Sequence, residues 1–153
     1  MYRFKKIEHN VLELIPSLIE KFKADGDIIC IYLFGSYAEG KQTPISDVDL
    51  AILLDKGFPA DRFFKKKLEL LALTTLLLKT DEVDLLILNE APSVLAYRVL
   101  SKGRLLWVNK AKRSQIVNFQ VRTYDHFFDF RPVERILHEG LIRRIKEGSF
   151  GGR

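Results

Sequence analysis

The chain contains a single cysteine, no long uninterrupted apolar segment, and no tract rich in glycine, proline or serine. One cysteine cannot form an internal disulfide or a zinc site, and Cys30 lies in an apolar run where a thiol is usually a small core residue. The most apolar segment, Leu68–Leu78, is interrupted by Glu69 and two threonines and is too short to cross a bilayer. We therefore expect neither a disulfide-stabilised scaffold nor a membrane-spanning helix.

Basic residues near the N-terminus are not followed by an apolar stretch, so we expect no signal peptide and a cytoplasmic location. The 153 residues are 47% hydrophobic and 29% charged, which is typical of one globular domain with a sizeable core. The net charge of +5 has two readings that stay open. It indicates contact with an anion such as a nucleotide, RNA or an acidic partner, or only a solvated surface with a few extra lysines.

Strand-like and helix-like segments alternate along the chain. Helices are predicted by apolar spacing over about 5–24 (divided at Pro16), 61–79, 93–102, 110–129 and 132–147. Strands are predicted over 28–34, 48–54, 83–88 and 104–108. The helix over 61–79 is apolar nearly all round at its C-terminal end, so we expect it to be heavily buried. This alternation predicts an α/β (α+β) fold with a small mixed sheet flanked by helices. We expect residues 1–108 to form the core and residues 109–153 a C-terminal helical extension of the same domain.

The segment FGSYAEGKQTPISDVDLAILL places a Gly-Ser pair after one strand and two aspartates at the start of the next. Gly35 lets the backbone approach a ligand closely, and the amides after it, in a short helical turn that we expect Ser36 to cap, form a phosphate site. Asp47 and Asp49 are two residues apart on a strand and so point to the same face. Two such carboxylates repel each other unless a hard cation such as Mg²⁺ lies between them.

A third acid, Asp84, is the only charged residue within the otherwise apolar strand at 83–88. If this strand lies beside the second one, three carboxylates meet, and three carboxylates can hold two metal ions. Each part alone has a simpler explanation: a turn for Gly-Ser, a solvated turn or helix cap for Asp-x-Asp, and a solvent-facing edge position for Asp84. Their order and strand context together favour a metal-dependent nucleotide site.

GS-x10-DVDLAILL followed by EVDLLIL resembles the minimal nucleotidyltransferases of the DNA polymerase β superfamily over about residues 28–90. The chain is also similar to the antitoxins of HEPN/MNT toxin–antitoxin modules. The resemblance implies that Gly35 and Ser36 bind the triphosphate and that Asp47 and Asp49 ligate both Mg²⁺ ions. It also implies that Asp84 completes the metal site and helps to deprotonate the acceptor hydroxyl. The implied reaction is AMP transfer from ATP, in the antitoxins onto a tyrosine of the cognate HEPN ribonuclease.

One position departs from the family pattern. Many relatives read GSxARG, whereas this chain has Glu39 at the arginine position. An acid there adds no attraction for a triphosphate, and Lys41 is the nearest basic replacement.

Two other functions remain open beside AMP transfer to a HEPN toxin. The chain could act as an antitoxin by binding alone, which Glu39 and the aromatic C-terminal region favour, or it could transfer a nucleotide to RNA or to a small molecule. The acceptor, the base preference and the state of homo- or hetero-oligomerisation stay open. The C-terminal region is also rich in aromatic residues, and these could pack in the core or form a surface that docks a partner. They are Phe119, Tyr124, Phe127, Phe128, Phe130 and Phe150.

Several further features invite weaker interpretations. Arg131 and His138 have about the spacing of the HEPN ribonuclease motif, but we interpret this as coincidence, and we interpret Arg122 with His126 in the same way. We expect the run Lys65–Lys67 to be a solvated helix face rather than an RNA contact, and Trp107 to pack in the core.

Overall fold

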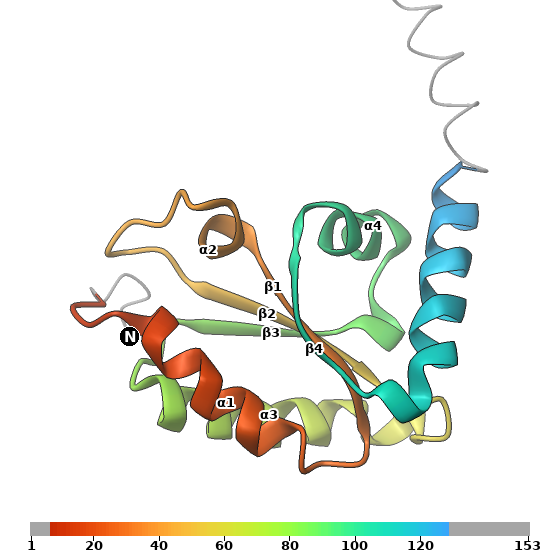
Figure 1. Ribbon diagram of the computed structural model, residues 1–153, viewed down its shortest axis with the longest axis horizontal. Helices are drawn as coiled ribbons and strands as arrows, with labels where there is room; N and C mark the ends of the chain where they lie inside the picture. Colours follow the sequence, from red (N-terminus) through yellow and green to blue (C-terminus); the bar gives the residue numbers. More distant parts are fainter. Residues whose placement is uncertain (1–6, 129–153) are drawn as a thin grey trace, which may run out of the picture.

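The computed structural model describes residues 7–128, whose four strands form one mixed sheet in the order β3-β2-β1-β4 (Figure 1). The strands are β1 (Ile28–Phe34), β2 (Val48–Leu54), β3 (Val83–Ile87) and β4 (Arg104–Val108). β1 runs antiparallel to β2 and to β4, whereas β2 and β3 are parallel. The predicted mixed α/β fold is confirmed, and the third strand does lie beside the second.

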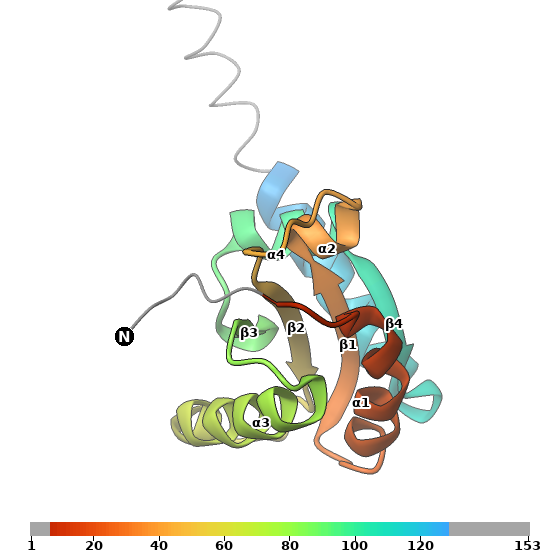
Figure 2. The same cartoon turned by 90° about the vertical axis from the view of Figure 1, so that its left-hand side faces the viewer.

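Helices cover both faces of the sheet. The α-helices are α1 (Ile15–Phe22), α2 (Gly35–Glu39), α3 (Phe63–Leu78), α4 (Ser93–Lys102) and a helix over 113–128. Short 3₁₀ turns are η1 (Val11–Leu14), η2 (Ala60–Arg62), η3 (Leu88–Glu90) and η4 (Lys110–Lys112). α1 and α3 lie on one face, and α2 and α4 on the other (Figures 1 and 2).

Alternation along β2 divides its side chains between two apolar clusters. Leu50 and Ile52 pack in the cluster that contains residues of α1 and α3, whereas Ala51 and Leu53 pack in the cluster that contains residues of α4 and the helix over 113–128. Because neighbouring side chains on a strand point to opposite faces, Asp49 shares the face of Ala51. The hydrophobic pattern of β2 therefore fixes which side of the sheet carries its acid.

The first helix begins later than predicted. Within the described residues, the segment over 7–10 is not helical and the next four residues form η1, whose start is capped by the Asn10 side chain accepting from the amide of Leu12. Pro16 stands in the first turn of α1, where its missing N–H breaks no helical hydrogen bond. The proline divides the segment as expected, but the piece before it is a 3₁₀ turn.

Two other expectations about helices are wrong. Only Leu70, Thr74 and Leu78 of α3 are buried, and Leu76 is 72% exposed, because the helix contacts the sheet along one side only. Ser36 caps nothing, since α2 begins at Gly35 after the extended Phe34 and shows no side-chain cap.

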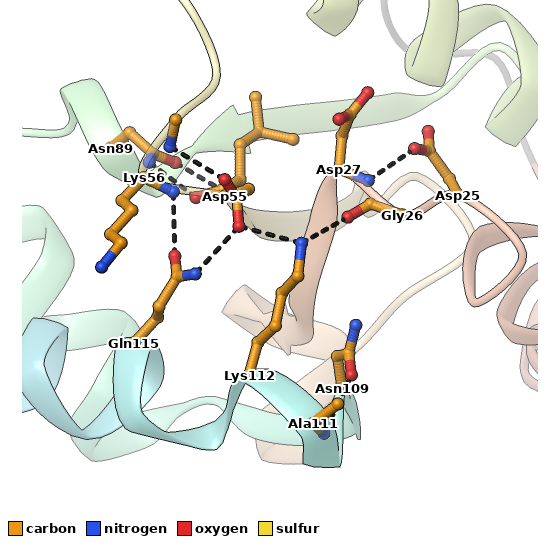
Figure 3. A network of polar contacts seen from close by, with 12 residues as sticks. Asp25, Gly26, Asp27, Asp55, Lys56, Asn89, Asn109, Ala111, Lys112 and Gln115 are labelled. Carbon is orange, nitrogen blue, oxygen red and sulfur yellow. Dashed lines mark hydrogen bonds and ion pairs between the residues drawn. The ribbon is translucent and has the colours of Figure 1, made fainter.

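A polar network attaches the helix over 113–128 to the sheet (Figure 3). Asp55, just after β2, accepts hydrogen bonds from Lys112 Nζ at 2.9 Å and from Gln115 Nε2 at 2.8 Å. Gln115 in turn accepts from the amide of Lys56, and Lys112 also donates to the carbonyl of Gly26. The start of the C-terminal helix is therefore held at the end of β2 by charged hydrogen bonds.

Some predictions lie outside the described residues. These are the helix over 132–147, Phe130, Phe150, and the pair Arg131 and His138. Among residues 7–128, no helix is both long and apolar enough to cross a membrane.

Candidate active site

The Gly-Ser bend at the end of β1 touches the first acid of β2. Gly35 has φ +71°, a left-handed conformation that disfavours residues with a side chain. A Cβ at this position would also collide with the Asp49 carboxylate. Only glycine satisfies both conditions, so the sequence Phe34-Gly35 allows the chain to turn into α2 directly against Asp49.

Asp49 and Asp84 are direct neighbours in the parallel register of β2 and β3. The register is supported by the amide of Val48, which donates to the carbonyl of Glu82 at 2.9 Å. Because paired residues on adjacent strands point to the same face, both carboxylates lie on the α2 and α4 side of the sheet. Asp47 stands just before β2, and its charge acts on Asp49, so the three predicted acids lie in one region of the structure.

The three carboxylates repel one another where solvent is limited. Burial and, to a smaller extent, the charges of Asp84 and Asp47 together raise the pKa of Asp49 to about 6. Asp84 is exposed and Asp47 is half-buried. Within residues 7–128, none of the three forms an ion pair with a lysine or arginine. Among the described residues, this concentration of negative charge is therefore uncompensated.

The donor set fits a hard divalent cation such as Mg²⁺, which prefers carboxylate oxygens and relieves their repulsion. No group of three acidic, histidine or cysteine side chains in the described part of the chain is gathered closely enough to form a ready-made metal cage. The acids therefore form an open platform on which a cation and a triphosphate would share the coordination.

Of the predicted nucleotide-binding residues, Gly35 lies against Asp49, Ser36 follows it in α2, and Lys41 comes just after α2. Ser36 is half-buried in α2, and its carbonyl accepts from the amide of Lys41 at 2.9 Å. The Lys41 side chain is 75% exposed, and its Nζ lies 3.8 Å from Glu39 Oε1. The Lys41 ammonium group is therefore paired with the acid that stands at the usual arginine position.

Other sequence features have structural roles. Trp107 packs partly buried against the core beside α1 and α3, as expected. Tyr97 of α4 stacks on Phe127 with ring centroids 3.8 Å apart, and Phe119 is 9% exposed, so part of the aromatic C-terminal region is core. Of the lysine run, Lys66 is not solvated, because its Nζ lies 2.6 Å from Asp25 and 3.3 Å from Asp27.

Comparison with known families decides what kind of protein carries this arrangement. Residues 17–112 match the family described as polymerase beta nucleotidyltransferase, a span that includes Gly35 and all three acids. The chain belongs to this nucleotidyltransferase family. The match runs from within α1 to the end of η4 and includes all four strands, so the predicted family and enzyme class are confirmed.

Individual relatives refine this family assignment. The chain is 29% identical over 119 residues to the protein adenylyltransferase MntA of Shewanella oneidensis, covering 78% of each protein. It superposes on a chain of a toxin–antitoxin crystal structure with AMP-PNP at a TM-score of 0.62 and 25% identity, covering 88% of this chain and 99% of that one. The fold is also shared by a chain of the complex between a tri-AMPylated HEPN toxin and an MNT antitoxin of Shewanella oneidensis. That chain superposes at a TM-score of 0.61 with 22% identity, covering 87% of this chain and 99% of that one.

Proposed function

We propose that this nucleotidyltransferase transfers AMP from ATP to a hydroxyl group of a protein, a tyrosine of a cognate HEPN toxin, and thereby acts as an antitoxin. The observation that carries the proposal is the direct pairing of Asp49 with Asp84 beside the glycine bend. The acceptor class is supported by the similarity to a protein adenylyltransferase, and ATP by the similarity to a complex with AMP-PNP.

Asp47 and Asp49 hold the metal ions that accompany ATP, and Asp84 completes the metal site. Bound Mg²⁺ supplies neutralisation of the triphosphate charge and a lower pKa for the acceptor hydroxyl. The acceptor oxygen forms a bond to the α-phosphorus while the bond to pyrophosphate breaks. Asp84 takes the proton of the hydroxyl, a role that fits the most exposed of the three acids.

Gly35, Ser36 and Lys41 hold the triphosphate. The backbone at Gly35 approaches Asp49 closely enough to place phosphate oxygens and metal-binding carboxylates in one site. The Ser36 hydroxyl donates to a phosphate oxygen, and Lys41 exchanges its contact with Glu39 for the triphosphate. The Glu39 side chain makes this contribution weaker than that of an arginine.

Labelled ATP, Mg²⁺ and a HEPN-type protein from a neighbouring gene test the proposal directly. We expect the neighbour to be labelled, and Asp49→Asn and Asp84→Asn each to lower the rate at least about 100-fold, because metal-bound charge stabilisation is a large part of the catalysis. Asp81→Asn, which removes an exposed acid next to β3, is the matched control and keeps the wild-type rate. Full labelling by the Asp49 and Asp84 variants would show that these residues do not carry the reaction.

A second candidate function is neutralisation of the partner by binding alone. The pairing of Glu39 with Lys41 favours it, because it reduces the positive charge available to a nucleotide. In that case the double variant Asp47→Ala with Asp49→Ala protects cells from the partner as well as the wild type does. Loss of protection in the double variant, with unchanged binding of the partner, rejects this alternative.

A further inference from the structure

A large groove lies at the end of the sheet away from the aspartates. Its volume is about 940 Å³, and one of its walls is a single face of the helix over 113–128. The opposite walls come from the end of β2, from η3 and from the start of α4. Apolar side chains contribute much of the lining. Leu53, Leu88, Ala96 and Phe119 are buried members of the core, whereas Val121 is 52% exposed. This volume is within the range of pockets that bind ligands.

Basic side chains accompany this apolar lining. Lys56, Arg122 and His126 line the groove, and no aspartate or glutamate does so among the described residues. All three are exposed, and within residues 7–128 neither Lys56 nor Arg122 forms an ion pair. We call this site, defined by these three residues and the apolar lining, the basic groove. Its chemistry is complementary to a segment that carries both carboxylates and apolar side chains.

Charge also argues against two occupants from this chain itself. Residues 129–153 contain six Lys or Arg against four Asp or Glu, a net charge of +2, and the whole chain carries +5. The net charge of that segment and of a second copy is positive, like that of the basic groove, which disfavours either of them as its occupant. A nucleic acid is a poorer match as well, because its binding depends on many phosphate contacts rather than on an apolar lining.

We propose that the basic groove docks an acidic, apolar segment of the partner protein. Docking of an amphipathic segment through its apolar side chains is a common mode of peptide recognition, and charges at the rim add specificity. That the partner is also the acceptor of AMP rests on the proposed function, whereas the complementarity of the groove does not. The groove then binds the partner at one end of the sheet while the aspartates lie at the other.

The test measures the affinity of the whole chain for a HEPN-type protein from a neighbouring gene. Lys56→Glu with Arg122→Glu reverses both charges of the groove, and Lys110→Glu with Arg113→Glu is the matched control. The control residues are exposed, one of them stands on the same helix, and neither lines the groove. We expect the dissociation constant to rise about tenfold or more for the groove variant and to change less than about twofold for the control.

Two further variants separate docking from catalysis. Val121 lines the groove and its side chain is 52% exposed. Val121→Ser should therefore weaken binding of the partner by removing an apolar contact, without any change of charge. Asp49→Asn should bind the partner as the wild type does. Where AMP transfer occurs, the groove variants should raise KM for the partner and leave kcat unchanged, because they act on binding alone. Thermal melts establish that each variant is folded.

Unchanged partner affinity in the Lys56→Glu, Arg122→Glu variant would overturn the proposal. So would a variant that binds the partner normally but loses ATP binding, or one that only changes self-association, since the groove would then hold a nucleotide or a second copy. If binding depends on the groove but the wild type transfers no AMP, the docking site stands and the proposed reaction fails.

Discussion

Gly35 meets two demands at a single position. Its left-handed backbone and its contact with the Asp49 carboxylate both exclude a side chain. We therefore expect Gly35→Ala to lower the free energy of unfolding by about 1–3 kcal/mol and to abolish nucleotidyl transfer, because the bend must move away from the metal-binding acid. Chemical denaturation and the labelling assay measure the two effects.

Substitutions at two other glycines distinguish the effect of a positive φ from the effect of a collision with a neighbouring side chain. Gly40 also has a positive φ, of 70°, but a Cβ there would meet nothing within 4 Å, and Gly26 has neither restriction. Gly40→Ala should therefore cost stability but retain most of its activity, and Gly26→Ala should change neither. If Gly35→Ala and Gly40→Ala behave alike, the contact with Asp49 has no importance for the reaction.

The raised pKa of Asp49 predicts a pH-dependent stability. Its pKa is about 6 in the folded protein against an ordinary value of 3.8, so the folded state binds this proton more tightly than the unfolded state does. Stability from this group is fully present below pH 3.8 and is lost as the pH rises through 6. Asp49→Asn does not titrate, so its melting temperature should exceed that of the wild type by an amount that grows from pH 4 to 6 and then stays constant.

Thermal melts between pH 4 and 8 in the presence of a chelator measure this difference. Asp81→Asn provides the control, since it removes an exposed acid outside the group of three. A constant difference between Asp49→Asn and wild type across this range would contradict the raised pKa of Asp49.

The acids of the site could be predicted from the sequence, whereas their contacts could not. Alternation on β2 and the lone acid in β3 determine that Asp49 and Asp84 share a face once the strands are neighbours. The collision at Gly35 depends on the path of the bend after β1, and the pairing of Lys41 with Glu39 depends on the left-handed turn at Gly40. Periodicity contains no information about such tertiary geometry.

At the level of elements, Asp55 connects the sheet with the C-terminal helix (Figure 3). Hydrogen bonds from Gln115, Lys112 and the amide of Gly57 lower the pKa of Asp55 to about 2. We expect Asp55→Ala to lower the free energy of unfolding by about 1–2 kcal/mol at pH 7, because charged hydrogen bonds are lost at a partly exposed site. Hydrogen exchange should show the largest increase in the helix over 113–128.

The pH dependence here has the opposite sign to that of Asp49. Because the folded pKa of Asp55 is depressed, its contribution is present above about pH 3.8 and is lost as the pH falls toward 2. Asp125→Ala, which removes an exposed acid from the same helix, is the control. Equal destabilisation by both substitutions would mean that the network does not hold the helix.

Strand boundaries were predicted better than helix burial. β1, β2, α4 and β4 begin and end as the apolar runs and their flanking glycines and prolines indicate. The predicted burial of α3 is wrong because its apolar side chains surround the helix, whereas the sheet contacts it on one side only. Phe64 and Leu76 are therefore more than 70% exposed. The fraction of an apolar helix that is buried depends on the elements that pack against it, and the sequence of the helix alone does not reveal these.

Across the whole molecule, the two ends of the sheet have different surfaces. Asp49 stands at the start of β2 and Lys56 just after its end, so the seven residues of the strand separate the acids from the basic groove by roughly 20 Å. A partner that uses both must extend along the α4 face of the sheet. The negative end is suited to a cation and triphosphate, and the basic end to an acidic protein surface.

Binding of Mg²⁺ to the folded protein alone should raise its stability, because a ligand that prefers the folded state shifts the folding equilibrium. At ten times the dissociation constant the gain is about 1.4 kcal/mol. Melting temperatures measured against Mg²⁺ concentration should therefore rise for the wild type and for Asp81→Asn, and stay level for Asp49→Asn and Asp84→Asn. Because this readout needs neither ATP nor a partner, equal rises in all four proteins would show that the paired acids do not hold the cation, whatever acceptor the enzyme uses.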